Sequence, residues 1–141
     1  SAMPVHKSPH HQTNNVEIAA LCAPRPLLVV SDGGDWTKNT PTVEYPYIRK
    51  VYAVYNAEDR VSNAHFQDEG HDYGYSKRAA VYDFFIRYLR LDDTLVKKGD
   101  GYKEDFVSVV PKESLMVLTK NPLPANSLQG DEAVMKYLGI H

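Results

Sequence analysis

The feature that most constrains the fold is a continuous apolar run, Leu27-Leu28-Val29-Val30, between Pro26 and the pair Gly33-Gly34. A short run of β-favouring residues without polar alternation is typical of a parallel strand that is covered on both faces. We therefore predict a strand over 27–31 in an α/β fold, with helices flanking the sheet. The run is far shorter than the ~18 residues that a membrane span needs.

Further helix and strand signals alternate along the chain. We predict helices over 16–23, 41–55 and 77–89 and a second strand over 61–66. Thr40 and Pro41 suit the N-cap and the first position of the middle helix, because a side-chain oxygen and a proline are favoured there. A helix between two strands crosses back over the sheet, so the two strands are expected to be parallel.

The beginning of the chain is predicted to lie outside this fold. Ser1-Ala2-Met3 is interpreted as the remnant of an expression tag, and residues 4–15 as a polar loop. The loop holds His6, His10 and His11, and imidazole is a common metal ligand. No carboxylate or cysteine completes a site with regular spacing, so a loop is the preferred interpretation.

Residues 92–141 are predicted to form a C-terminal extension. We expect short strands over 106–110 and 115–118 and a last helix over 130–138. The net charge of -2 lacks the basic field of nucleic-acid or membrane-surface proteins, so neither partner is expected. The single cysteine, Cys22, excludes a disulfide within the chain.

Acid and histidine side chains follow the two predicted strands. Asp35 lies four residues after Ser31, and His71 lies just past the second strand, 36 residues after Asp35 (71 minus 35). Because the carboxyl ends of parallel strands meet at one edge of a sheet, we expect the two side chains to lie close together. A carboxylate that orients a proton-accepting histidine is part of a catalytic triad. We predict Asp35 as the acid and His71 as the general base, with Asp32 as the weaker candidate for the acid.

Three segments carry a resemblance to a known family. They are Glu17-Ile18-Ala19-Ala20-Leu21 with Ala23-Pro24-Arg25-Pro26-Leu27-Leu28, Asp32-Gly33-Gly34-Asp35-Trp36-Thr37, and Glu69-Gly70-His71-Asp72-Tyr73. Together they resemble the acetyl xylan esterase and dienelactone-hydrolase-like branch of the α/β-hydrolase superfamily. The resemblance implies the C-terminal part of an α/β-hydrolase domain over residues 16–91, no cofactor, and an acylated carbohydrate or other small ester as substrate. Trp36 and Tyr73 lie on the two predicted loops and are candidates for lining a substrate pocket.

The chain departs from that family because it lacks a nucleophile. No serine lies in a Gly-x-Ser-x-Gly motif, and Cys22 fits a buried apolar position better than a catalytic one. We therefore expect the serine in a missing N-terminal portion and expect this fragment alone to be inactive. The strand over 27–31 needs neighbours at both edges, so it would pair with that portion or with a second copy of the chain.

Two other functions use some of the same residues. A non-catalytic binding or interaction module would use Trp36 and the tyrosines for stacking on sugar. The residue at the upstream nucleophile position separates this alternative from an esterase. A metal site made by His65, His71 and Asp72 is less favoured, because His65 falls in the middle of a strand and no further ligand has convincing spacing.

Overall fold

Two units make up the chain. The computed structural model describes residues 5–140, so the predicted tag remnant over residues 1–3 lies outside the described residues. The first unit, Ser1–Lys103, contains every predicted site residue, and the second is Glu104–His141. Within the described residues, no helix has both the length and the apolar character that crossing a membrane requires.

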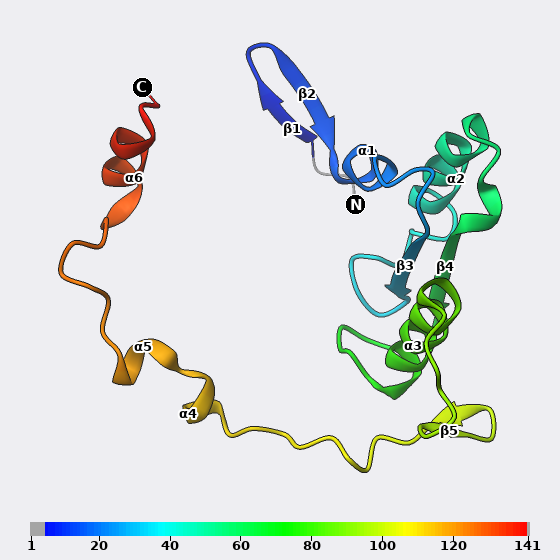
Figure 1. The fold of residues 1–141 in the computed structure, drawn as a ribbon. Coiled ribbons are helices and arrows are strands. Elements are labelled where there is room, and N and C mark those ends of the chain that lie inside the picture. Colours follow the sequence, from blue (N-terminus) through cyan, green and yellow to red (C-terminus); the bar gives the residue numbers. More distant parts are fainter. Residues whose placement is uncertain (1–4, 141) are drawn as a thin grey trace. The chain divides into compact units, whose positions relative to one another are not determined.

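A pair of parallel strands forms the centre of the first unit. β3 (Leu27–Asp32) and β4 (Val61–Phe66) lie side by side in Figure 1 and pair in register over their full length. The connection between them carries α2 (Glu44–Val54) and the short 3-10 helix η1 (Glu58–Arg60). Both predicted strands and their parallel direction are confirmed.

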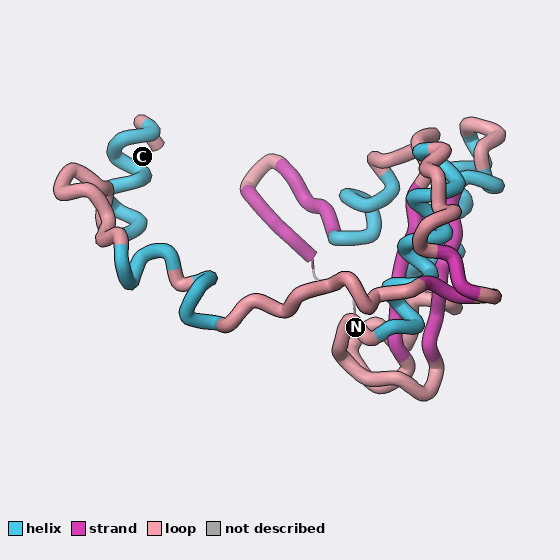
Figure 2. Tube along the Cα trace, turned by 60° about the horizontal axis from the view of Figure 1, so that its bottom comes forward, coloured by secondary structure: helices cyan, strands magenta, loops and turns pink. Residues whose placement is uncertain are grey.

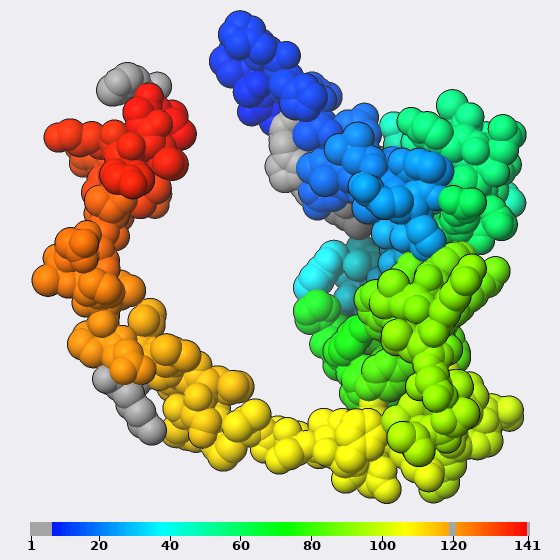
Figure 3. Space-filling model, viewed as in Figure 1, coloured from blue at the N-terminus to red at the C-terminus, as the bar shows by residue number. Residues whose placement is uncertain are grey.

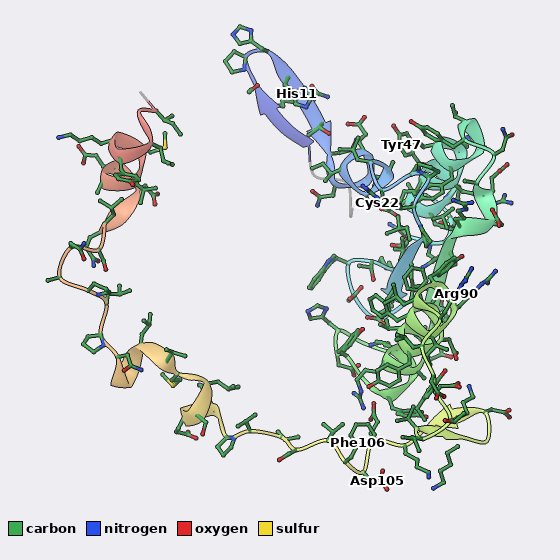
Figure 4. All side chains as sticks on the ribbon, viewed as in Figure 1. His11, Cys22, Tyr47, Arg90, Asp105 and Phe106 are labelled. Atoms are coloured by element: carbon green, nitrogen blue, oxygen red, sulfur yellow. The ribbon has the colours of Figure 1, made fainter. Side chains whose placement is uncertain are left out.

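One face of the strand pair is covered by α1 and α2. α1 (Asn15–Ala20) begins at a capping box, in which the Asn14 side chain accepts from the N–H of Glu17 and the Glu17 carboxylate accepts from the N–H of Asn14. Tyr52 of α2 is fully buried and donates its hydroxyl to the Arg25 carbonyl at 2.6 Å. Tyr47, labelled in Figure 4, is largely exposed on the same helix. The buried core cluster is Val16, Ala20, Ile48, Tyr52, Ala57 and Val61.

α2 begins three residues later than predicted, at residue 44 instead of residue 41. Thr40, the predicted N-cap, is buried, and the chain around it forms turns. The Thr40 carbonyl accepts from the N–H of Tyr45 at 2.9 Å, so this turn leads directly into the helix. Pro46 then lies in the first helical turn, where the N–H that it lacks has no partner within the helix.

The opposite face is covered by α3 (Tyr75–Leu89), the predicted C-terminal helix, which starts two residues earlier than expected. Successive strand residues point to opposite faces, so Leu28 and Ala64 face this helix while their neighbours face α1 and α2. Leu28 and Ala64 line a shallow groove together with Phe84 of α3. α3 ends at Arg90 (Figure 4), whose left-handed conformation, φ 54°, stops the helix.

Residues 5–14 form a hairpin, which corrects the loop predicted over 4–15. β1 (Val5–Ser8) and β2 (His11–Asn14) are antiparallel, with Ser8 opposite His11 next to the turn. His11 is labelled on this hairpin in Figure 4. The backbone hydrogen bonds of a two-stranded ladder need no apolar side chains. A hairpin of polar residues therefore has none of the hydrophobic alternation from which strands are predicted.

The segment after α3 is tied back to that helix. The short strands β5 (Lys97–Lys98) and β6 (Gly101–Tyr102) pair antiparallel, and the buried Tyr102 donates its hydroxyl to Asp83 of α3. Its backbone N–H also donates to the Tyr75 hydroxyl at 2.6 Å. The beginning of the predicted C-terminal extension is therefore anchored to α3 through the Tyr102 residue.

The second unit has no buried core among the residues whose burial is described. Figure 3 shows it as a narrow run of residues, coloured from yellow to red. It contains α4 (Lys112–Leu115), α5 (Val117–Lys120) and α6 (Gly130–Leu138). The last helix was predicted, but the strands predicted over 106–110 and 115–118 are wrong. Among the described residues, no strand pairs with residues 106–110 or 115–118. Helical turns occupy most of residues 115–118.

Candidate active site

The two predicted site loops leave the strand pair at the same end. Figure 2 shows the loops after β3 and β4 next to each other, beyond the carboxyl ends of both strands. Two backbone hydrogen bonds join them: the N–H of Gly33 donates to the Phe66 carbonyl at 3.0 Å, and the N–H of Gly34 donates to the Glu69 carbonyl at 2.9 Å. We call the loop after β3, which carries Asp35, the acid loop, and the loop after β4, which carries His71, the histidine loop. These two hydrogen bonds continue the pairing of the strands between the loops.

Gly33 permits this close approach. A Cβ atom built on Gly33 would lie 1.8 Å from the backbone oxygen of Gln67, which no side chain can tolerate without a backbone shift. At Gly70, in contrast, an added Cβ would meet nothing within 4 Å. Packing therefore requires a glycine at position 33, whereas a side chain at position 70 would point into open space.

Replacing Gly33 with alanine is expected to lower the free energy of unfolding by about 1–3 kcal/mol, the usual cost of forcing extra volume into a packed site. The matched control, Gly70→Ala, should change it by less than about 0.5 kcal/mol. Urea unfolding of both variants measures the difference. Equal effects at the two positions would contradict the close approach of the loops.

Asp35 and His71 are brought together by these loops. The Nδ1 atom of His71 lies 3.2 Å from Oδ2 of Asp35. A carboxylate only accepts, so Nδ1 carries the proton and donates it. The Asp35 side chain is 5% exposed and the His71 side chain 66% exposed. With Nδ1 bound to Asp35, Nε2 is the ring nitrogen available for proton transfer at the surface.

Thr37 holds the acid in its ionised form. Both the backbone N–H of Thr37, at 2.6 Å, and its hydroxyl donate to Oδ1 of Asp35. The Thr37 hydroxyl also accepts from the N–H of Asp32 at 2.8 Å, which orients it. The hydrogen bond from the Thr37 hydroxyl is the main cause that lowers the pKa of Asp35. Burial of the carboxyl group acts in the opposite direction, and the hydrogen bonds from the Thr37 N–H and from His71 lower the pKa further.

This arrangement predicts how stability depends on pH. The pKa of Asp35 in the fold lies below its ordinary value of about 3.9. The resulting stabilisation is fully present above that ordinary value and is lost as the pH falls through the lower folded pKa. Thr37→Val removes the hydroxyl bond and keeps the N–H, so we expect the Asp35 pKa to rise and the loss of stability in acid to shrink. NMR titration of the carboxyl carbon and urea unfolding across a pH series test this; an unchanged Asp35 pKa would contradict it.

Aromatic rings lie beside the pair. The Trp36 ring packs against the His71 ring, with centroids 4.2 Å apart and planes tilted by 43°, while 61% of Trp36 remains exposed. Tyr73 is also largely exposed, two residues after His71. Both residues predicted to line a pocket therefore present apolar ring surface on the two site loops.

Asp32, the weaker candidate for the acid, has a different partner. Its carboxylate forms an ion pair with Lys77, whose Nζ lies 2.9 Å from Oδ1 of Asp32. Lys77 also contacts Asp72 at 2.8 Å. Sequence reasoning missed Lys77, because a lysine in the first turn of an amphipathic helix is normally a surface residue, and only its burial reveals the role.

His65 lies in a separate network. Its Nδ1 is 2.9 Å from the Ser31 hydroxyl, and its Nε2 is 3.0 Å from the Gln67 side-chain oxygen. Ser31 is buried and also accepts from the Asn63 amide at 2.9 Å, so this serine has no exposure for attack on a substrate. Within residues 5–140, no group of three or more His, Cys, Asp or Glu side chains is arranged to hold a metal ion.

Comparisons with known proteins relate the chain to an ester hydrolase. No family model matches the sequence, and no curated protein matches it. Among solved structures, the chain is similar to one described as Methylesterase BT1017, with 43% sequence identity and a TM-score of 0.71. The match covers 89% of this chain and 27% of that one, so the chain spans about a quarter of the neighbour's length. The mixed α and β structure with small sheets and this similarity indicate an esterase-like relationship and a hydrolase-like fold.

Proposed function

We propose that this chain supplies the acid and the general base of a serine carboxylic-ester hydrolase, as the C-terminal part of an α/β-hydrolase fold of the acetyl xylan esterase and dienelactone-hydrolase-like branch. The hydrogen bond between Asp35 and His71 carries the proposal, since it joins two loops in the order acid, then histidine. The similarity to a methylesterase supports ester hydrolysis as the kind of reaction.

The proposed reaction has two steps. The Nε2 atom of His71 takes the proton of a serine hydroxyl as that oxygen attacks the ester carbonyl carbon. The bond to the alcohol oxygen then breaks, and His71 returns the proton to the departing alcohol. Water attacks the acyl-serine in the same way, with His71 again accepting and returning a proton, and the carboxylic acid leaves. Asp35 stays ionised, fixes the ring tautomer and stabilises the imidazolium.

The nucleophile belongs, in this proposal, to an N-terminal portion of the same protein. The neighbouring methylesterase is several times longer than the matched segment, and the sequence contains no Gly-x-Ser-x-Gly motif. β3 is apolar over residues 27–30 and pairs only with β4 among the described residues. Its second edge is therefore the place where a further strand would add, and the exposed His71 would face the serine.

The proposed substrate is an acylated carbohydrate or another small ester. Trp36 and Tyr73 would stack against an apolar ring face of such a substrate. The neighbour's name favours a methyl ester, whereas the sequence resemblance favours an acetyl ester. Both require the same acyl-serine chemistry and differ in whether the carbohydrate is the acid or the alcohol.

The test uses the reading frame upstream of this segment. We expect a Gly-x-Ser-x-Gly elbow on the order of a hundred residues before Asp35. The polypeptide containing both parts should release methanol from a methyl-esterified carbohydrate or acetate from an acetylated one, and residues 1–141 alone should release neither. An upstream segment with neither serine nor cysteine at the elbow would instead favour a non-catalytic binding module.

A further inference from the structure

Lys77 is a buried cation between the two site loops. It lies in the first turn of α3 with 1% of its side chain exposed. The Nζ atom donates to the Gly70 carbonyl at 2.6 Å and to Oδ1 of Asp72 at 2.8 Å, and lies 2.9 Å from Oδ1 of Asp32. The three N–H bonds of the ammonium group donate to the Gly70 carbonyl, to Oδ1 of Asp72 and to the Asp72 carbonyl, and the contact to Asp32 is an ion pair.

The partners of Lys77 surround His71. Gly70 and Asp72 are the residues immediately before and after it, and the Asp72 carbonyl accepts from Lys77 as well, at 3.1 Å. Asp32 is the last residue of β3, where the acid loop begins. One side chain thus holds both backbone neighbours of the histidine against the strand that leads to Asp35.

Burial makes this contact expensive to break. Taking the ammonium out of water would by itself lower the pKa of Lys77, but the carboxylates of Asp72 and Asp32 outweigh that effect and raise it. Removing the lysine would leave the buried Asp32 carboxylate without its cation, which is more destabilising than losing an exposed pair.

We propose that Lys77 is a positioning residue that fixes the His71 loop to the acid loop, so that Nδ1 of His71 stays within reach of Asp35. The inference rests on the proposed function for its catalytic consequence, because Lys77 touches neither substrate nor the reacting atoms. We call these contacts of Lys77 the Lys77 clamp. In that reaction, loss of the clamp misplaces the His71 ring by about 1 Å, which lowers kcat by about 10²-fold and leaves KM nearly unchanged.

The test reads the imidazole directly and needs no nucleophile. Nitrogen NMR of the His71 ring in residues 1–141 distinguishes the tautomer with the proton on Nδ1 from the tautomer with the proton on Nε2. The wild-type chain and the control Lys50→Met, an exposed lysine on α2, should show the Nδ1–H tautomer. Lys77→Met, which keeps the length of the side chain and removes its charge, should show a mixture of both tautomers.

A folded Lys77→Met chain with an unchanged His71 tautomer would overturn the inference. If this variant does not fold, Asp32→Asn decides, because it weakens only the contact to the acid loop: a tautomer mixture supports the clamp, and an unchanged ring overturns it. Failure of the proposed function would give a different result: the longer polypeptide would not hydrolyse esters, while the His71 tautomer would still change in Lys77→Met.

Discussion

His71→Ala is expected to lower kcat/KM for ester hydrolysis by about 10⁶-fold in the polypeptide that contains both this segment and the nucleophile. The reason is that Nε2 of His71 carries the proton in both directions, and the ring is already held by Asp35 at 3.2 Å. Without the imidazole, the serine stays protonated and the alcohol leaves without a proton. Initial rates with a chromogenic ester measure the loss.

The control for this variant is His11→Ala, a change at an exposed histidine of β2. It should leave kcat/KM within about twofold of the wild-type value, because its effect on stability is expected to be small. A loss of less than tenfold in His71→Ala would mean that another residue is the general base.

Asp35→Asn is expected to lower kcat by about 10⁴-fold with little change in structure, because an amide that donates to Nδ1 selects the wrong tautomer. The accepting carboxylate oxygen, Oδ2, lies opposite the two Thr37 donors on Oδ1. The same substitution at Asp32 provides the comparison, since Asp32 pairs with Lys77 and not with the histidine.

The order of the two losses is the informative result. We expect Asp35→Asn to cost roughly a hundredfold more activity than Asp32→Asn, whose effect passes through the Lys77 clamp. A larger loss in Asp32→Asn would make Asp32 the acid of the triad and would contradict the assignment of Asp35.

The juxtaposition of Asp35 and His71 could be predicted because it depends on strand periodicity and direction. The apolar run over 27–30 and the weaker strand over 61–66 define two parallel strands, and parallel strands bring the loops after them to one edge. The two glycines after β3 allow tight backbone geometry, and Gly33 does lie against the next loop. These features depend on residues that are close together in the sequence, so the sequence pattern indicates them.

The features that escaped prediction depend on tertiary contacts. Lys77 is buried only because Asp32, Asp72 and a carbonyl converge on it, and nothing in its neighbours along the chain signals that burial. Thr40 was expected to cap α2, but it is buried in a series of turns and the helix begins at Glu44. The polar hairpin over 5–14 lacks the apolar alternation that identifies strands.

The most direct measurement of the central claim is covalent labelling with a fluorophosphonate, which reacts with a serine only when that serine is activated by a base. The longer polypeptide should be labelled on the serine of a Gly-x-Ser-x-Gly elbow, and His71→Ala should abolish the labelling while the protein remains folded. Labelling at the same rate in His71→Ala, or no labelling in a folded wild-type protein, would contradict the account that Asp35 and His71 form the acid and base of a serine esterase.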